Sequence, residues 1–362
     1  MQIIKDRRAL HRIPELDREL PKTLGYLKNA LEGLRCQVFS PMAGALCAYF
    51  DFGAEKTVAF RSDADALPIT EATGADYAST HPGRMHACGH DGHMAIALEL
   101  ARRLDRKERL SRNVLIVFQP AEETTGGAKD LCDTGVFRDH HVEAIFGLHL
   151  WPGVEAGKVF SRRCEMMSRS CEVTVEVKGK SAPIAKAWEG VDAMVAAVDL
   201  YQRVRDMEAA LPKDVFRILN FGKFRSGSVR NAISGSALLE GSLRVFQDEV
   251  FFSLQDEIRR IAAGVARDTG CEVTVEMNDG YPAVLNPGDL YDKVRRLVPF
   301  HELEAPSMIT EDFSWYQRYV PGMFFFLGTG SSPALHNDRF DFDETVLERG
   351  ADFFEKLAEA WI

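Results

Sequence analysis

A short stretch of the sequence, residues 85–94 (MHACGHDGHM), concentrates residue types that bind metal ions. It places one cysteine and three histidines within eight positions, although the chain of 362 residues contains only ten histidines. A thiolate and a neutral imidazole are good zinc ligands, and the glycine between Cys88 and His90 allows a turn tight enough to present both. We therefore expect Cys88 and His90 to bind metal. We do not expect this of His86 or His93, which can equally support the site or begin a helix.

Two close ligands do not complete a metal site, so the remaining ligands must come from elsewhere in the chain. Glu123, His149 and His336 are the natural suppliers, and they give a mixed set of sulfur, nitrogen and oxygen donors. Such a set suits Zn²⁺ or a pair of divalent ions such as Zn, Mn, Co or Ni. Five protein ligands exceed the three of a usual single catalytic zinc ion, which favours two ions per chain.

Two adjacent glutamates, Glu122 and Glu123, follow an apolar run. Neighbouring side chains of an extended segment point in different directions, so one can bind metal while the other faces a substrate. We assign Glu123 to the metal. We assign Glu122 to general base and acid catalysis, in which it takes a proton from water attacking a carbonyl and returns it to the leaving amine. Asp65 is expected to orient a ligand imidazole from behind.

Each of these features also has an ordinary interpretation when taken alone. A glutamate pair often lies on a solvated face or at the start of a helix. His149 could be a histidine of the hydrophobic core whose nitrogens are hydrogen-bonded within the protein. His336 could be an ordinary residue of a turn. The joint placement of these residues, rather than any one of them, favours a functional site.

The elements that must position these residues alternate between strand and helix. Apolar periodicity predicts helices at 20–34, 94–106 and 343–362, and strands at 44–52, 56–68, 113–119, 143–151 and 322–330. Asp65 and His149 come near the ends of predicted strands, and the glutamate pair and His336 follow such ends. In open α/β sheets ligands bind outside the carboxyl ends of the strands, so we expect one common crevice.

The middle of the chain follows a different pattern. Its elements are predicted in the order β-α-β-β-α-β over residues 171–277, which is the split pattern of a ferredoxin-like domain. We expect an α/β catalytic domain formed by residues 1–166 and 281–362. An α+β domain at 167–280 is expected to be inserted into it.

Composition excludes several classes of protein. The net charge is −10 and no Lys/Arg stripe is present, which argues against nucleic acid and anionic membranes as partners. The first residues lack the features of a signal peptide, and no apolar run approaches the roughly 18 residues of a membrane span. The seven scattered cysteines do not form a disulfide framework, so the cytoplasm is the expected location.

Eight segments in chain order resemble the M20 metallopeptidase family. The similarity is closest to its amidohydrolase branch, which includes hippurate hydrolases, plant auxin–amino-acid conjugate hydrolases and N-acetyl-diaminopimelate deacetylases. The segments are 7–16, 61–69, 85–93, 118–128, 147–152, 229–246, 310–316 and 335–344. The resemblance implies a zinc-aminopeptidase-like catalytic domain with a dinuclear site, and an inserted lid domain that often dimerises.

Carried over by position, the resemblance makes Glu122 catalytic and implies the same five ligands: Cys88, His90, Glu123, His149 and His336. It also implies that Asn231 and Arg244, on the lid, approach the substrate. An arginine on a strand could equally be a solvated surface residue.

One departure from the family pattern concerns the lid. Pro183 stands where the family usually has a histidine that helps to hold the oxyanion, and Ser234 replaces a usual proline. Proline has no N–H to donate, and loss of one oxyanion donor costs about 10²–10³ in rate.

These features together predict a metal-dependent amidohydrolase that cleaves an N-acyl amino acid, of the aminoacylase or deacetylase type. Its expected partners are two divalent ions, the small substrate and, through the lid, a second copy of the chain. The alternatives are a short-peptide hydrolase (dipeptidase) of the same family, or a catalytically impaired metal-binding relative.

Overall fold

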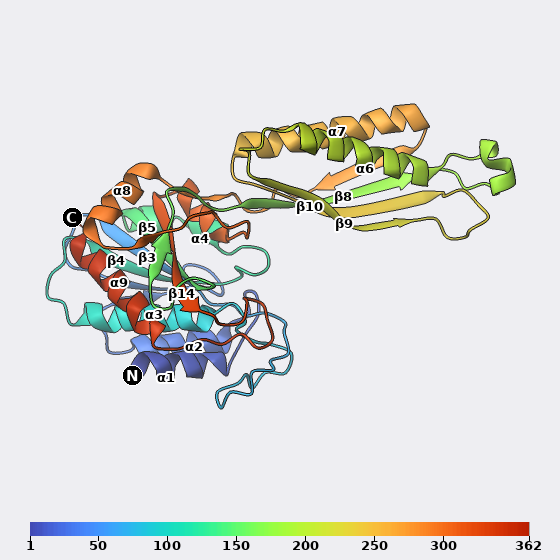
Figure 1. Cartoon of the computed structure of the whole chain (residues 1–362). Coiled ribbons are helices and arrows are strands. Elements are labelled where there is room, and N and C mark those ends of the chain that lie inside the picture. The colour runs from blue at the N-terminus through green and yellow to red at the C-terminus, as the bar shows by residue number, and fades with distance from the viewer. Residues whose placement is uncertain (362) are drawn as a thin grey trace. The chain divides into compact units, whose positions relative to one another are not determined.

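The computed structural model describes residues 1–361, which divide into two compact units. The first unit comprises Met1–Met166, Val284–Pro306 and residues 311–361, and the second comprises Met167–Ala283 and Ser307–Thr310. Figure 1 shows the elements of both units, coloured by position along the chain. The second unit therefore interrupts the first in sequence, and each is described by itself.

The first unit is built on an eight-stranded mixed sheet with strand order β1-β2-β4-β3-β5-β14-β6-β13. Its strands are β1 (Gln37–Phe39), β2 (Leu46–Phe50), β3 (Thr57–Asp63), β4 (Asn113–Gln119), β5 (Val142–Pro152), β6 (Val159–Ser161), β13 (His301–Glu302) and β14 (Gly322–Gly330). A small separate sheet pairs β7 (Cys164–Met167) with β12 (Val284–Asn286). The helices are α1 (Gln2–His11), α2 (Pro21–Leu31), α3 (His90–Asp105), α4 (Ala128–Asp133), α5 (Val136–Asp139), α8 (Gly288–Leu297), α9 (Val346–Ala360) and the 3₁₀ helix η2 (Asp312–Arg318).

Four neighbouring strands in the middle of this sheet, β4, β3, β5 and β14, run parallel to one another. All seven residues of β3 and of β4 are buried, as expected for parallel strands covered on both faces. Their carboxyl ends lie at the same edge of the sheet. The segments that follow them carry the residues predicted to form the site.

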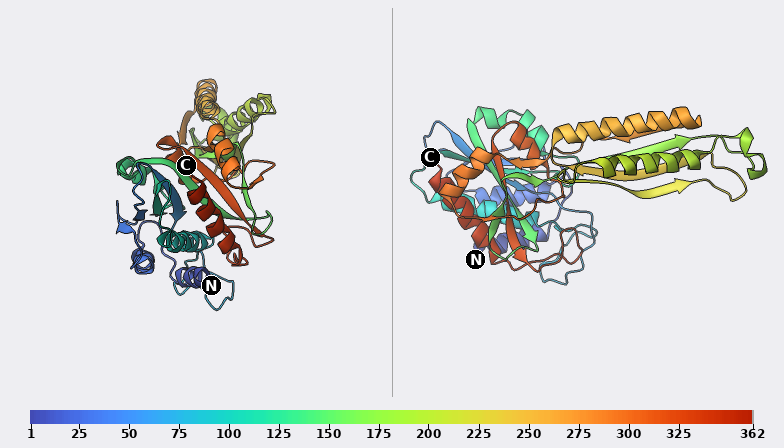
Figure 2. Two further views of the ribbon diagram at one scale, coloured as in Figure 1. Left: turned by 90° about the vertical axis from the view of Figure 1, so that its left-hand side faces the viewer. Right: turned by 45° about the horizontal axis from the view of Figure 1, so that its top comes forward.

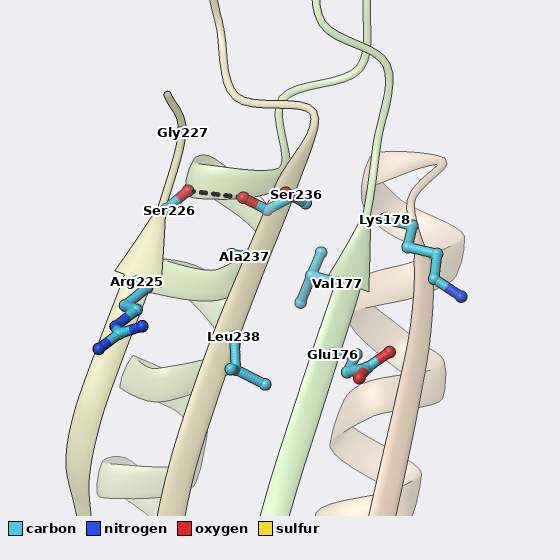
Figure 3. Close-up of a pocket in the computed structure, with 9 residues that line it drawn as sticks. All are labelled: Glu176, Val177, Lys178, Arg225, Ser226, Gly227, Ser236, Ala237 and Leu238. Carbon is cyan, nitrogen blue, oxygen red and sulfur yellow. Dashed lines mark hydrogen bonds between the residues drawn. The ribbon is translucent and has the colours of Figure 1, made fainter. Parts of the chain in front are cut away.

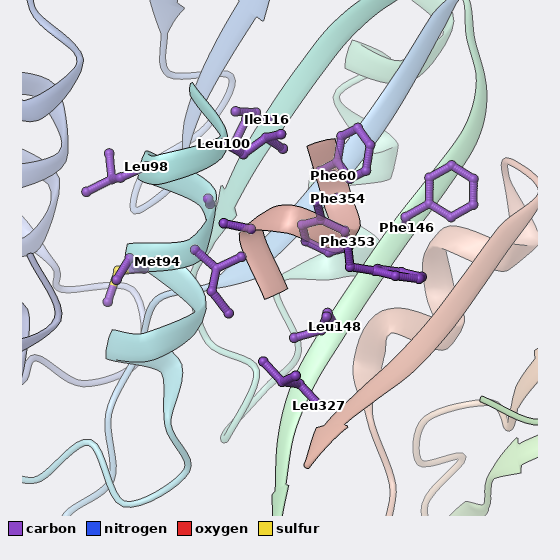
Figure 4. Close-up of a cluster of buried hydrophobic side chains, with 14 of the residues drawn as sticks. Phe60, Met94, Leu98, Leu100, Ile116, Phe146, Leu148, Leu327, Phe353 and Phe354 are labelled. Carbon is purple, nitrogen blue, oxygen red and sulfur yellow. The ribbon is translucent and has the colours of Figure 1, made fainter. Parts of the chain in front are cut away.

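One face of the sheet carries the main hydrophobic core. Successive strand residues point to opposite faces, so Phe60 of β3 and Phe146 of β5 point into this core, together with residues of α3 and α9. Figure 4 shows the cluster: the Phe60 ring lies 5.8 Å from that of Phe146 and 4.8 Å from that of Phe354, between ring centroids. This packing fixes the strands whose ends carry the site.

Alternate residues of the same strands point to the opposite face, where polar side chains are buried. Arg61 of β3, Gln119 of β4 and His149 of β5 share this face by strand alternation, and η2 packs against α4 and β14 beside them. β5 extends to Pro152, so His149 lies inside the strand and not at its end as expected from the sequence.

The second unit is a four-stranded antiparallel sheet with order β11-β8-β10-β9. Its elements in chain order are β8 (Arg169–Lys178), the 3₁₀ helix η1 (Ile184–Glu189), α6 (Ala193–Ala210), β9 (Arg217–Ser226), β10 (Ser236–Val245), α7 (Asp248–Thr269) and β11 (Glu272–Met277). Both helices cover one face of the sheet, as Figures 1 and 2 show. They enclose a separate apolar core that includes Val175, Leu239 and Ile258.

The other face of this second sheet is polar. Figure 3 shows a hollow where β8 and β9 end and β10 begins, lined in part by Glu176, Lys178, Arg225 and Ser236. No residue of the predicted site lines this hollow.

The predicted α/β class is confirmed by this mixed sheet and its covering helices. Helix α1 was not predicted from the sequence. No helix within residues 1–361 is both long enough and apolar enough to cross a membrane.

Candidate active site

The Cys/His stretch forms a tight turn that leads into helix α3. Gly89 has a φ of 84°, in the left-handed region, and a Cβ there would lie 3.1 Å from Leu150, so glycine is required. Cys88 and His90 on either side are buried. His90 Nδ1 donates to the backbone oxygen of Asp65 at 2.8 Å, so Nε2 is the nitrogen that can bind a metal ion. Burial lowers the pKa of His90, but the charge of Asp63 and a hydrogen bond to Asp65 outweigh burial and raise it to about 10, so a metal ion would displace a proton from Nε2.

The glutamate pair lies on the turn that follows β4. The Asp65 carboxylate accepts the backbone N–H of Glu122 at 3.1 Å and that of Glu123 at 3.0 Å. Asp65 therefore orients the His90 imidazole through its backbone oxygen, while its carboxylate holds the turn of the two glutamates. The closest approach of that carboxylate to His90 Nδ1 is 3.6 Å.

The structure brings the five expected metal ligands and Glu122 close together. Cys88 Sγ lies 3.4 Å from His149 Nε2, His336 Nε2 lies 3.3 Å from Glu123 Oε1, and His90 Nε2 lies 3.7 Å from the same oxygen. Atoms that could bind metal lie within 4.8 Å of one another in the set Cys88, Glu123 and His336 and in the set His90, Glu122 and Glu123. His149 Nδ1 donates to the Leu150 oxygen, so its Nε2 is the nitrogen that accepts from the Cys88 thiol.

Two further buried residues lie beside this group: His93, which the sequence left open as a supporting residue, and Asp63, which was given no role. Asp63 accepts a hydrogen bond from His93 Nδ1 at 2.6 Å, and His93 Nε2 accepts the Leu150 N–H at 2.9 Å. Both nitrogens of His93 are thus bonded to protein atoms, so His93 would lose a hydrogen bond if it bound metal. The second oxygen of Asp63 lies 3.5 Å from His90 Nε2.

Arg61, a buried arginine near the glutamate pair, was also not identified from the sequence. Arg61 donates to Gln119, Asp63, Glu311 and Asp312 at 2.8–2.9 Å. Oxygens of Glu311 and Asp312 lie within 4.8 Å of one of Glu122. Two signals in the sequence could have revealed this cluster: a charged residue within an apolar strand, and an adjacent Glu-Asp pair at 311–312.

Comparison with known proteins identifies the family. Residues 59–360, most of the chain, match the family described as peptidase family M20/M25/M40. The chain belongs to this family. The resemblance found in the sequence is therefore confirmed.

Relatives of this M20 chain are similar over nearly their whole length. An N-acetyldiaminopimelate deacetylase of Streptococcus suis (strain 05ZYH33) is 34% identical over 366 residues, covering 97% of both chains. One of Streptococcus sanguinis (strain SK36) is 35% identical over 356 residues, covering 94% of this chain and 93% of the relative. The crystal structure of the Bacillus subtilis YXEP protein, a dinuclear metal binding peptidase from the M20 family, is 28% identical, with a TM-score of 0.85 and coverage of 99% and 96%. The M20 chain is accordingly a metal-dependent hydrolase of amide bonds.

The electrostatics of the M20 site call for cations. Six buried or nearly buried carboxylates face one permanent positive charge, Arg61; they are Asp63, Asp65, Glu122, Glu123, Glu311 and Asp312. Burial, and then the charges of Glu311 and Glu123, raise the pKa of Glu122 well above its ordinary value. Burial raises the pKa of Glu311 to about 8, although Arg61 opposes the shift. Such a cluster is stable only when protons or cations compensate its charge.

The unpaired atoms and the donor types of the site fit divalent metal. His90 Nε2 and Glu123 Oε1 are buried and have no hydrogen-bond partner among residues 1–361, although buried polar atoms are rarely left unpaired. Burial, and then Glu123 and Glu122, raise the pKa of the Cys88 thiol well above its usual value, so a metal ion would displace its proton. The site therefore offers sulfur, nitrogen and oxygen donors to a cation.

Replacing Cys88 with serine should lower the metal bound per chain, because a hydroxyl is a much weaker ligand than a thiolate. We expect fewer metal equivalents by elemental analysis after dialysis, with an unchanged circular dichroism spectrum. Cys47, also buried but in β2, provides the matched control, and Cys47→Ser should retain the full metal content. Unchanged stoichiometry in Cys88→Ser would remove Cys88 from the ligand set.

Asn231 and Arg244, the two predicted substrate contacts, belong to the second unit. Arg244 lies on β10, where its guanidinium donates to the backbone oxygen of Met308. The backbone oxygen of Asn231 accepts the Ile184 N–H at 3.0 Å. Their contact with substrate remains a prediction.

Proposed function

We propose that this M20 hydrolase cleaves the amide bond of an N-acyl amino acid and releases a carboxylate and a free amino acid. The observation that carries the proposal is the position of Glu122, whose carboxylate lies within 4.8 Å of ligand atoms of His90 and Glu123. We assign two divalent ions to Cys88, His90, Glu123, His149 and His336, with Glu122 as the general base and acid.

In this mechanism the residues of the chain position and move protons. Bound divalent ions would supply Lewis-acid polarisation of the substrate carbonyl and make water easier to deprotonate. Glu122 accepts a proton from the water whose oxygen forms the new bond to the carbonyl carbon. It then donates that proton to the nitrogen as the C–N bond breaks, so the amine leaves neutral. Burial, and then the charge of Glu311, raise the pKa of Glu122 in the metal-free site. Bound cations would lower it again, so that the carboxylate could accept the proton.

The positions of the two glutamates depend on Asp65. Its carboxylate binds both backbone N–H groups, so the general base and the adjacent ligand are fixed together. Rigid placement of the base is worth more than its basicity alone, because misplacement by about 1 Å can cost about 10²-fold in rate.

The names of the relatives support an N-acetylated amino acid as the substrate. Two relatives that align over more than nine-tenths of this chain are named N-acetyldiaminopimelate deacetylase. The second candidate substrate is a short peptide, which the description of the Bacillus subtilis protein as a peptidase favours.

A catalytically impaired, metal-binding role is the third candidate, and Pro183 supports it. Pro183 lies in the second unit, immediately before η1, and has no N–H to donate to an oxyanion. We assign substrate contacts to Asn231 and Arg244 and the role of a lid to the second unit. The first unit is the catalytic domain in this assignment.

Turnover of a substrate panel tests the three candidates together. We expect the zinc-, manganese- or cobalt-reconstituted protein to hydrolyse N-acetyl amino acids, including N-acetyldiaminopimelate, faster than dipeptides. A chelator should abolish the activity and added metal should restore it. Faster dipeptide cleavage would favour the peptidase. Metal binding without turnover of any compound would favour the impaired relative, and activity that is indifferent to chelation would refute the mechanism.

We also propose a homodimer formed through the second unit. Strand β9 ends its sheet, and α6 exposes a row of apolar side chains that includes Val195, 60% exposed, and Val198, 51% exposed. An unpaired edge strand beside an apolar helix face is suited to a second copy of itself. Light scattering should give twice the chain mass for the wild type and the single mass for Val198→Asp. Leu285→Asp, at an exposed apolar residue of the first unit, should remain dimeric, and a monomeric wild type would end the proposal.

The cytoplasm is the proposed location. All seven cysteines are free in the structure, which suits a reducing compartment. Cell fractionation would test this directly.

A further inference from the structure

A second arginine, Arg7 of α1, is fully buried in the first unit and has no role in the mechanism. Its guanidinium reaches three carboxylates: Nε lies 2.8 Å from Asp91, NH2 lies 3.0 Å from Asp341, and NH1 lies 3.2 Å from Glu344. Burial of a charged group is costly unless its partners are well placed. The position of these three carboxylates in the chain therefore indicates what Arg7 stabilises.

The three carboxylates belong to the two segments that supply most of the metal ligands. Asp91 directly follows His90 and lies three residues after Cys88. Asp341 and Glu344 lie in the segment that carries His336 and that ends at α9. One side chain of the first helix thus joins two ligand segments that are distant in sequence.

The segment that carries His336 has little regular structure to hold it. His336 has a φ of 64°, which is costly for a residue other than glycine, and its side chain is 53% exposed. Its backbone N–H donates to the oxygen of Ala87 at 2.8 Å, next to Cys88. A strained conformation persists only where the surroundings determine it, so the contacts farther along the segment must contribute.

Those contacts converge on Arg7. Its guanidinium carbon lies 4.7 Å from the ring centroid of Phe342 and 4.8 Å from that of Tyr77. The Tyr77 hydroxyl donates to Asp341 at 2.7 Å. Arg8, by comparison, binds only Glu344 of this segment and is half exposed, so it adds little specificity.

We infer that Arg7 is a positioning residue, which holds the His336 segment against the Cys88–His90 turn in the geometry that metal binding requires. This inference rests on the metal site assigned under the proposed function. Residues that orient ligands from behind typically change metal affinity about 10–100-fold when replaced. The effect should fall mainly on the ion that His336 binds.

Asp341→Asn is the sharpest test, because asparagine can still accept the Tyr77 hydrogen bond while it loses the charge that faces Arg7. Asp343→Asn is the matched control, because Asp343 lies two residues along the same segment and its carboxylate accepts from the nearby Thr345. Chelator competition should show one ion per chain bound about 10–100-fold more weakly in Asp341→Asn and wild-type affinity in Asp343→Asn. The visible absorption of bound Co²⁺, which reports ligand geometry, should change in Asp341→Asn alone.

Arg7→Met provides a second variant that should weaken the same ion at least as much, and Asp341→Asn decides the matter if Arg7→Met fails to fold. Wild-type affinity and a wild-type Co²⁺ spectrum in Asp341→Asn would overturn the inference, as would an equal loss in Asp343→Asn. Metal binding by the wild type is measured first. A wild type that binds no metal would refute the proposed function itself, whereas the other contrary outcomes refute only the role of Arg7.

Discussion

Replacing Glu122 with glutamine is expected to lower kcat by about 10²–10⁴-fold, the usual contribution of a positioned acid or base, while the metal content stays at the wild-type level. Glutamine keeps the size and polarity of the side chain but cannot accept a proton from water. The Asp65 hydrogen bond to the Glu122 backbone does not depend on the side chain, so the turn should keep its shape. Steady-state kinetics and elemental analysis of the same preparation would measure both quantities.

The matched control is Glu32→Gln, at an exposed position just after α2 in the same unit. It should leave kcat and metal content unchanged. Wild-type kcat in Glu122→Gln would assign the proton transfer to another group. Loss of metal together with activity would instead make Glu122 a ligand.

Replacing Arg61 with methionine is expected to destabilise the first unit by about 3–5 kcal/mol, the usual cost of removing one partner from a buried ion pair. Methionine fills much of the same volume, but Asp63, Glu311 and Asp312 would lose their common cation in a site where Arg61 is about 1% exposed. Such a loss is a large part of the about 5–15 kcal/mol that stabilises a typical domain. The midpoint of chemical denaturation of the metal-free protein, measured by tryptophan fluorescence, would report it.

Arg138→Met is the control for this experiment, because Arg138 pairs with Asp139 on the surface and its side chain is 83% exposed. Exposed ion pairs contribute little to stability, so this variant should denature at the wild-type midpoint. Equal midpoints for Arg61→Met and the wild type would show that other groups or protons neutralise the charge of the carboxylates when Arg61 is absent.

The sequence predicts much of the fold because apolar periodicity reports burial directly. The fully buried run of β4 and the alternation in β8 follow from which faces of each strand are covered. The site could be located because strand ends in an α/β sheet converge at one edge, so that Glu123 and His336 could be grouped although they are distant in sequence. Helix α1 was missed because its sequence is strongly charged, and only the structure shows that Arg7 and Asp6 are buried.

The supporting residues were harder to predict than the expected ligands. The sequence could single out Asp65, but it could not show which of its atoms contacts which partner. In the structure the backbone oxygen of Asp65 accepts from His90, whereas its carboxylate accepts from the backbone of Glu123. The sequence marks Arg61 and the Glu311–Asp312 pair only as unusual residues; it does not show that Arg61 and Glu311, 250 residues apart, contact each other.

The pairing of Arg7 with Glu344 has a consequence for how the protein matures. These side chains lie 337 positions apart, and the second unit is made between them. Contacts between segments that are distant in sequence form late because closing a long loop has a large entropy cost. The turn around Cys88 can form early from local interactions, but it lacks the His336 ligand until this long-range contact closes. Metal uptake by the newly made chain would therefore report that the first unit has finished folding, and not merely that the local turn has formed.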